Sequence, residues 1–359
     1  MGERTVIPFG PHHPVLPEPI HLDLVLEDER VVEAIPQIGY IHRGLEKLVE
    51  KRDFKQYTYI AERICGICSF MHGMGYCMSV ESIMKLEIPE RAEFLRTIWA
   101  EMSRIHSHML WLGLTADAFG FESLFMHSWR LREKVLDLFE ETTGGRVIFS
   151  VCDIGGVRKD IDAETLQKIV RVLTEMGEEL KPLADVFLND FSVKSRTVGV
   201  GVLTKEKAEE LGAIGPMAKA SGVNLDMRTQ GYAAYKHLNF EPITATQGDS
   251  YARMVVRIKE IYQAIDLIRQ CVEKIPEGDV LVKFKGNPDG EYFTHIEQPR
   301  GEVLYYVKAN GTSFLDRVRV RTPTFANVPA LLETLKNCDL ADVPILVLTI
   351  DPCISCTER

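Results

Sequence analysis

The sequence predicts an α+β fold that is mainly α, with an N-terminal β segment, a central bundle of long helices and a C-terminal α+β segment. Three observations support this prediction. Apolar residues alternate with polar ones near the N-terminus, they recur at helical spacing through the middle, and short apolar runs return near the C-terminus. No repeat or linker divides the chain. We therefore expect one domain over residues 1–359, built from segments 1–42, 43–275 and 276–359.

The N-terminal segment is predicted to start as extended chain and then to form strands. Leu22, Leu24 and Leu26 alternate with more polar neighbours, as in a strand with one buried face. Residues 28–29 indicate a turn, and residues 31–32 indicate a return strand. Prolines keep the residues before this hairpin extended or turning: Pro8, Pro11, Pro14, Pro17 and Pro19.

Four long helices are predicted in the middle of the chain. Their apolar residues recur every three or four positions over 94–112, 124–139, 169–183 and 254–272. Helices of this length bury their apolar stripes against one another. The pattern therefore predicts a helix bundle.

The C-terminal segment is predicted to contain strands at 280–284, 303–307 and 343–350. The last run is apolar almost throughout, which is typical of a strand buried on both faces. Asp351 and Pro352 end this run and turn the chain toward its last residues. We therefore expect a buried strand followed directly by a turn.

Composition and charge narrow the possible functions. The chain is 45% hydrophobic and 26% charged, as in soluble globular proteins, and no apolar run is long enough to cross a bilayer. The first residues lack the pattern of a secretory signal, which predicts a cytoplasmic chain. Partner subunits would hold such a chain at the membrane. The net charge of −10 argues against nucleic acid as a partner.

Two Cys-x-x-Cys pairs stand near opposite ends of the chain, Cys65 with Cys68 and Cys353 with Cys356. Each pair offers two sulfurs from one turn, so the two pairs together can bind a soft or borderline metal. A zinc ribbon closes over a short loop, whereas here most of the protein must fold before the pairs meet. A structural four-cysteine zinc site and a redox dithiol are the alternatives. The other cysteines are expected to be inert buried thiols: Cys77, Cys152, Cys271 and Cys338.

The residues around both pairs resemble the signatures of nickel–iron hydrogenase large subunits. Residues 63–68 read R-I-C-G-I-C and are followed by a histidine, and residues 351–356 read D-P-C-I-S-C. The resemblance implies that all four cysteines bind nickel. Cys68 and Cys356 would also bridge to iron, which carries carbon monoxide and cyanide in that family. It further implies that an extension is removed after the second pair.

The same resemblance implies roles for four residues around the metals. His72 would donate a hydrogen bond to a cysteine sulfur, and Arg300, in a P-R-G segment, would overhang the open side of the metals. Thr324, in a P-[ST] element, would bind a cyanide on iron, and Asp351 would border the site. The alternatives are a core histidine, a surface strand arginine, a turn threonine and an aspartate that caps the turn.

Two carboxylates complete the expected site. Glu18 corresponds to the glutamate of an R-I-E-G-H segment and is the predicted proton relay, with an exposed loop carboxylate as the alternative. Glu46 lies in a segment similar to an R-G-x-E element whose glutamate binds magnesium in many hydrogenases. Those proteins complete the magnesium site with a C-terminal histidine, but this chain has Arg359 there. A Glu46–Arg359 ion pair is therefore the alternative to magnesium.

Other segments are similar to the quinone-pocket subunit of respiratory complex I: residues 10–14, 39–47, 143–146 and 155–158. Together with the cysteine signatures, they resemble the membrane-bound, energy-converting hydrogenases of the Ech and carbon-monoxide-induced types. The resemblance implies reversible reduction of protons to hydrogen on the cytoplasmic side of the membrane. Ferredoxin would supply electrons through a small iron–sulfur subunit, and further hydrophilic and membrane subunits would couple the reaction to ion translocation. The alternative is a complex-I-like quinone- or partner-binding subunit without metal, which the four cysteines argue against.

Overall fold

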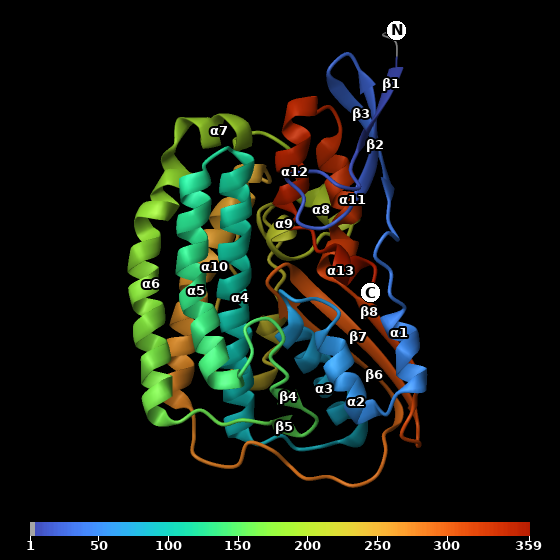
Figure 1. Ribbon diagram of the computed structural model, residues 1–359, viewed down its shortest axis with the longest axis vertical. Helices are drawn as coiled ribbons and strands as arrows, with labels where there is room; N and C mark the ends of the chain where they lie inside the picture. The colour runs from blue at the N-terminus through green and yellow to red at the C-terminus, as the bar shows by residue number, and fades with distance from the viewer. Residues whose placement is uncertain (1–3) are drawn as a thin grey trace.

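The computed structural model describes residues 4–359 and places a helical bundle beside a smaller region of sheets and short helices (Figure 1). The bundle consists of α4 (Glu90–Ala118), α5 (Glu122–Thr143), α6 (Ala163–Asn189) and α10 (Ser250–Lys274). All four long helices predicted from periodicity are therefore confirmed. No helix within residues 4–359 is both long and apolar enough to span a bilayer.

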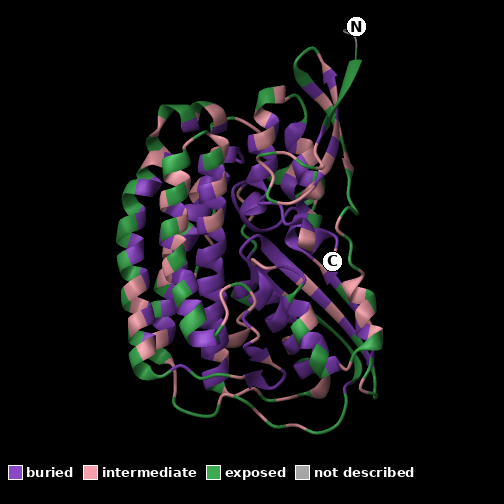
Figure 2. Cartoon of the chain, in the orientation of Figure 1, coloured by how far each residue is buried: buried purple, intermediate pink, exposed green. Residues whose placement is uncertain are grey.

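The central helix of the bundle is α4, which packs against both α5 and α10. It is buried along most of its length, whereas α6 exposes one face (Figure 2). Side chains of Asp162 and Asp249 cap the N-termini of α6 and α10 by accepting hydrogen bonds from Thr165 N and Ala252 N. Buried on several faces, α4 can carry polar side chains into the interior of the protein.

The N-terminal sheet extends from one end of the molecule (Figure 1). It is antiparallel in the order β1 (Arg4–Phe9), β2 (His21–Glu27) and β3 (Arg30–Gln37). Leu22, Leu24 and Leu26 are buried, as their alternation predicted. They pack in a core that also includes residues of α11 (Pro323–Leu335) and α12 (Val343–Thr349).

The C-terminal sheet is also antiparallel, in the order β6 (Asp289–Gln298), β7 (Gly301–Asn310) and β8 (Leu315–Arg321). Helix α3 (Ser69–Met84) packs on β6 and β7, and it begins directly after the first cysteine pair. This arrangement brings the sheet, the first pair and the bundle together. The strand predicted at 303–307 lies within β7 and is confirmed.

Two predicted strands are wrong. Residues 343–350 form helix α12 instead, with Pro344 in its first turn. An apolar run buried on all sides has no periodicity to separate a helix from a strand, and here the helix packs against α4, α10 and α11. Residues 280–284 form no regular strand, although Leu281 makes an isolated bridge to Gly156.

The remaining elements are short and connect these layers. They are α1 (Leu45–Leu48), α2 (Phe54–Glu62), α7 (Phe191–Thr197), α8 (Lys205–Glu210), α9 (Gly215–Lys219), α13 (Ile354–Thr357), β4 (Cys152–Asp153) and β5 (Gly156–Val157). Four 3-10 helices join them: η1 (Val49–Lys51), η2 (Met227–Gln230), η3 (Ala233–His237) and η4 (Leu340–Asp342).

Candidate metal centre

Four thiols from opposite ends of the chain meet in one buried cluster. Cys65 Sγ lies 3.2 Å from Cys353 Sγ, and Cys68 Sγ lies 3.3 Å from Cys356 Sγ. All four sulfurs lie within 4.8 Å of one another. Sulfurs this close, with no disulfide between them, suit ligation of a common soft or borderline ion.

The local backbone positions both pairs. Cys68 precedes the first residue of α3, so the first pair forms the turn that enters this helix. Asp351 has a positive φ of 54°, a conformation that aspartate tolerates, and this reverses the chain between α12 and the second pair. Arg43 links the two turns, because its guanidinium donates to the carbonyls of Ile64 (2.7 Å) and Ser355 (3.1 Å).

The protonation of the cluster fits a cation between the sulfurs. Burial acts to raise the pKa of Cys68, but hydrogen bonds from Cys353, Cys356 and Cys65 hold that pKa well below its usual value. The pKa values of Cys353 and Cys356 are raised well above theirs, by neighbouring thiols and by burial. Metal ligands must be thiolates, so a bound metal ion would ionise Cys353 and Cys356 against this rise in pKa.

His72 lies between the cysteines and the C-terminal sheet. Its Nε2 is 3.3 Å from Cys356 Sγ and 3.4 Å from the amide nitrogen of Gln298, and its Nδ1 is 2.6 Å from the hydroxyl of Tyr305. The imidazole is fully buried on α3. It can donate to the sulfur only from Nε2, in which case Nδ1 accepts from Tyr305.

Arg300 is buried beside the thiols. Its guanidinium donates to both the carbonyl and the carboxylate of Asp351, each at 2.8 Å, and to Ser107 Oγ at 3.3 Å. Burial lowers the pKa of Arg300, but Asp351 and the nearby thiols more than offset this and raise it above its usual value. A permanent positive charge therefore faces the cluster.

Two threonines hold the second pair in place. Thr324, in the first turn of α11, accepts a hydrogen bond from Cys353 N at 3.1 Å. Thr322 donates to the carbonyl of Cys356, also at 3.1 Å. Thr324 thus lies against the cluster, and its hydroxyl proton is free for another acceptor.

Glu18 lies against the backbone of the second pair. Its carboxylate accepts hydrogen bonds from the amides of Ile354 and Ser355, the latter at 3.0 Å, and from the Ser355 hydroxyl. The same side chain lines a cavity of about 400 Å³ with His12 and His13. Glu18 therefore joins the buried turn to an opening at the surface.

Glu46 lies in a cluster of guanidinium groups. Its carboxylate accepts from Arg359 Nε at 2.9 Å and from Val320 N at 2.9 Å, and Arg319 and Arg317 lie 3.6 and 4.0 Å away. The structure therefore contains the ion pair that was the alternative to magnesium. Three positive charges around one carboxylate disfavour a divalent cation.

The structure brings all the predicted residues except Glu46 into one neighbourhood around the four sulfurs. Sequence reasoning missed Ser107, Gln298 and Tyr305, which contact Arg300 and His72. Ser107 lies on a helix and the other two lie on strands, and no motif marks them. Arg43 was also missed, although it lies in the segment that contains Glu46.

Comparisons with known proteins agree with this arrangement. The family model described as "Nickel-dependent hydrogenase" matches residues 43–114, and the model described as "Respiratory-chain NADH dehydrogenase, 49 Kd subunit" matches residues 118–287 and 282–359. The alpha subunit of a membrane-bound hydrogenase from Pyrococcus furiosus is 38% identical, over 98% of this chain and 87% of that protein. The carbon monoxide-induced hydrogenase of Rhodospirillum rubrum is 38% identical, over 98% of this chain and 99% of that protein.

A solved structure is also similar. A chain of the membrane-bound sulfane sulfur reductase, an archaeal respiratory membrane complex, superimposes with a TM-score of 0.95 at 31% identity, covering 99% of both chains. The name of that complex refers to an activity on sulfane sulfur. The same fold therefore occurs in complexes with different named activities, and the residues of the site must decide between them.

Proposed function

Because the chain belongs to the family of membrane-bound, energy-converting hydrogenase subunits related to the 49 kDa subunit of respiratory NADH dehydrogenase, we propose that it is the catalytic large subunit of such a hydrogenase. It would reduce protons to hydrogen reversibly. The observation that carries this proposal is the buried cluster of four cysteines, with Arg300 beside it. A subunit that only binds quinone has no use for four converging thiols.

The group proposed for the cluster is a nickel–iron centre with carbon monoxide and cyanide on the iron: all four cysteines would hold nickel, and Cys68 and Cys356 would also hold iron. Soft thiolates suit nickel, and a bridging sulfur keeps two metals close. When bound, this group supplies the electron-pair chemistry that forms or splits the bond of hydrogen.

The surrounding residues would orient and balance this group. Arg300 offsets the negative charge of the thiolates and restricts the open side. Thr324 has a hydroxyl proton available for a cyanide nitrogen, and His72 tunes one sulfur through a hydrogen bond. Asp351 fixes Arg300 with two hydrogen bonds.

Glu18 would move protons between the cysteine turn and the surface. Its carboxylate contacts Ser355, between the two cysteines of the second pair, and also lines the cavity that contains His12 and His13. A carboxylate in this position can accept a proton near the thiolates and release it toward solvent.

Partners would supply electrons and couple the reaction to the membrane. The four cysteines outside the cluster lie apart from it as free thiols, so an iron–sulfur cluster would belong to a small partner subunit. By family, ferredoxin would be the electron donor, and membrane subunits would hold this chain on the cytoplasmic side and translocate ions. Magnesium is not included in the proposal, because arginines surround Glu46.

The second candidate is a complex-I-like, quinone- or partner-binding subunit without metal. The match of the 49 kDa family model over most of the chain favours it. A structural zinc site is a third, weaker candidate. Four cysteines are enough to bind a structural zinc ion, which needs neither an arginine such as Arg300 nor a proton relay such as Glu18.

Metal analysis of the purified complex separates these candidates. We expect nickel and iron in about equal amounts at this subunit, and infrared bands of carbon monoxide and cyanide. Cys68→Ser should abolish hydrogen turnover, because a hydroxyl is a poor nickel ligand. Cys338→Ser, a half-buried thiol outside the cluster, should keep activity. A complex without nickel and iron, or one fully active with zinc alone, would refute the proposal.

A further inference from the structure

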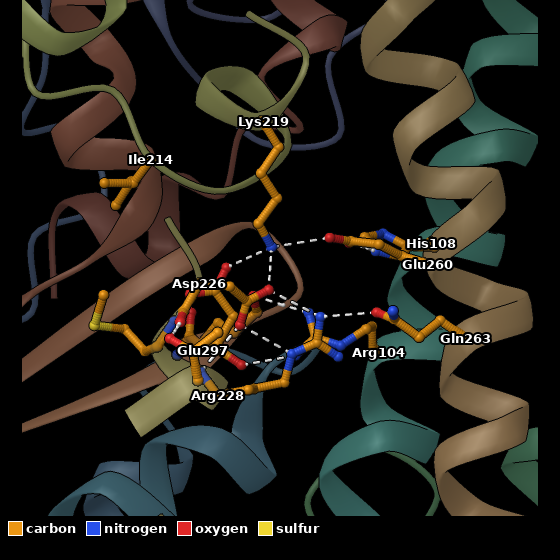
Figure 3. A network of polar contacts seen from close by, with 12 residues as sticks. Arg104, His108, Ile214, Lys219, Asp226, Arg228, Glu260, Gln263 and Glu297 are labelled. Atoms are coloured by element: carbon orange, nitrogen blue, oxygen red, sulfur yellow. Dashed lines mark hydrogen bonds and ion pairs between the residues drawn. The ribbon is translucent and has the colours of Figure 1, made fainter. Parts of the chain in front are cut away.

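A second group of buried ionisable residues lies outside the cysteine cluster, between the bundle and β6 (Figure 3). Its members come from four helical segments and one strand, and all are almost completely inaccessible to solvent. They are Glu101, Arg104 and His108 of α4, Lys219 of α9, Asp226 and Arg228 at η2, Glu260 of α10 and Glu297 of β6.

Lys219 is the centre of this group. Its Nζ lies 3.0 Å from Glu260 and 3.0 Å from Glu297, and it also pairs with Asp226 (Figure 3). Arg228 contacts Asp226 at 2.9 Å and Glu101 at 3.2 Å. One ammonium group is therefore shared by three carboxylates.

The charges in the group do not balance. Within residues 4–359 it contains four carboxylates, Glu101, Asp226, Glu260 and Glu297, but three cations in direct contact with them, Lys219, Arg104 and Arg228. Four negative and three positive charges leave one negative charge. A net charge in a dry interior is costly, so the group favours one bound proton.

Arg257 is the next cation and faces Glu260 from one turn away on α10. Its guanidinium donates to the carbonyl of Thr349 at 2.7 Å and lies over the ring of Trp111 at 4.3 Å. It forms no ion pair with the carboxylates of the group. The positive charge of Arg257 therefore partly offsets the net negative charge of the group from a distance, without an ion pair to any of its four carboxylates.

Glu297 is the carboxylate best placed to hold the proton. Among the described residues it forms one ion pair, with the shared Lys219, and its other oxygen accepts from Met227 N at 3.0 Å. Arg104 donates to the backbone carbonyl of Glu297, at 2.9 Å, and not to its carboxylate. The Glu297 carboxylate thus has one side-chain donor within residues 4–359, Lys219, whereas Glu260 has both Lys219 and His108, and Glu101 and Asp226 each contact an arginine.

Protonation energetics agree with this geometry. Burial, and then the neighbouring Asp226, raise the pKa of Glu297 to about 7. Burial acts in the same direction on Glu101, Asp226 and Glu260, but their cations and hydrogen bonds lower the pKa values below the usual range. Burial lowers the pKa of His108, which leaves this imidazole neutral.

A short path connects Glu297 to the cysteine cluster. Gln298 follows it on β6, and the Gln298 amide lies 3.4 Å from His72, which in turn contacts Cys356. Arg104 also donates to the carbonyl of Gln298 at 3.2 Å. In a low-dielectric interior, a change of charge at the sulfurs is screened less than in water and can act along this path.

We propose that Glu297 is a redox-linked proton-binding site: its carboxyl holds the single proton of the buried group and binds it more tightly when an electron is added at the cysteine cluster. The first half stands on the geometry of the group, and the second half rests on the proposed hydrogenase function. Added negative charge at the cluster favours the neutral carboxyl over the carboxylate. The iron–sulfur partner subunit of the proposed function supplies the electron, and solvent supplies the proton.

Stability measurements on the intact complex test the first half. Glu297→Gln imitates the neutral carboxyl, so its melting temperature should stay close to that of the unmodified complex. Asp226→Asn removes an ionised partner of Lys219 and Arg228, so its melting temperature should fall clearly. An equal loss in both variants, or a failure of Glu297→Gln to assemble, would show that Glu297 is ionised.

A redox titration of the metal centre, followed by its infrared bands, tests the second half. The unmodified complex should show a pH dependence of the midpoint potential near neutral pH that is weaker in Glu297→Gln. The same pH dependence in both would refute the redox link. If the complex contains no nickel and iron, the proposed function fails, and the melting comparison still decides whether Glu297 is protonated.

Discussion

At the scale of single residues, the site depends on where a few polar groups touch the two cysteine turns. Glu18 contacts the second turn through both carboxylate oxygens, and His72 contacts one sulfur. The sequence predicted Glu18 as a proton relay near the thiolates, and that role stays a prediction. The contact of His72 with a sulfur was expected too, but Tyr305, which fixes the orientation of the imidazole, was not.

Replacing Glu18 tests the relay. Glu18→Gln keeps the shape and one acceptor oxygen but cannot carry a proton. Hydrogen turnover should fall by about 10²–10⁴-fold, the range for general acid–base groups. Metal content and infrared bands should be unchanged, which separates proton transfer from assembly. Glu33→Gln, on an outward-facing position of β3, serves as the control. Normal turnover in Glu18→Gln would mean that protons leave by another route.

The pKa of Glu297 also predicts a pH dependence of stability. Because its pKa is raised to about 7 in the folded protein, the folded state binds more protons than the unfolded state. The free energy of unfolding therefore falls as pH rises from the unfolded pKa toward 7, by on the order of a few kcal/mol over this interval. Urea unfolding of Glu297→Gln across this range should lack that decrease, and an identical decrease in both proteins would contradict the assignment.

At the scale of elements, the sequence was most informative where one face of an element is buried. Helices α5 and α6 and strand β2 have that property, and their periodicity predicted them. Helix α12 is buried all round, so its apolar run gave no period and was misread as a strand. The contacts between Gln298, Tyr305 and His72 join residues more than two hundred positions apart, which local patterns do not encode.

The first residue of α9 predicts a specific glycine effect. Gly215 has a φ of +60°, and an added Cβ would overlap the carbonyl of Arg300. Gly215→Ala should therefore displace Arg300 and lower both stability and hydrogen turnover. Gly212→Ala has a similar φ of +64° but open space around the new methyl group, so it should cost about 1 kcal/mol of stability and leave turnover intact. Equal effects on turnover would contradict a role for the close contact.

At the scale of the whole molecule, the cysteine cluster joins the two ends of the chain. A bound metal would therefore stabilise the last residues against α3 and the C-terminal sheet. Complex prepared without nickel should show faster amide hydrogen exchange over 351–359, whereas α4 and α10 should be unchanged. Equal protection of 351–359 with and without metal would show that packing alone holds this segment. The predicted single domain over residues 1–359 stays a prediction.

The separation of 288 residues between Cys65 and Cys353 has a consequence for synthesis. At translation rates of about 5–20 residues per second, the second pair leaves the ribosome roughly 15–60 s after the first. During this interval the first pair is an incomplete thiol turn that cellular maturation factors can reach. The time at which a metal is delivered, and not only its affinity, would then influence which ion the finished protein retains.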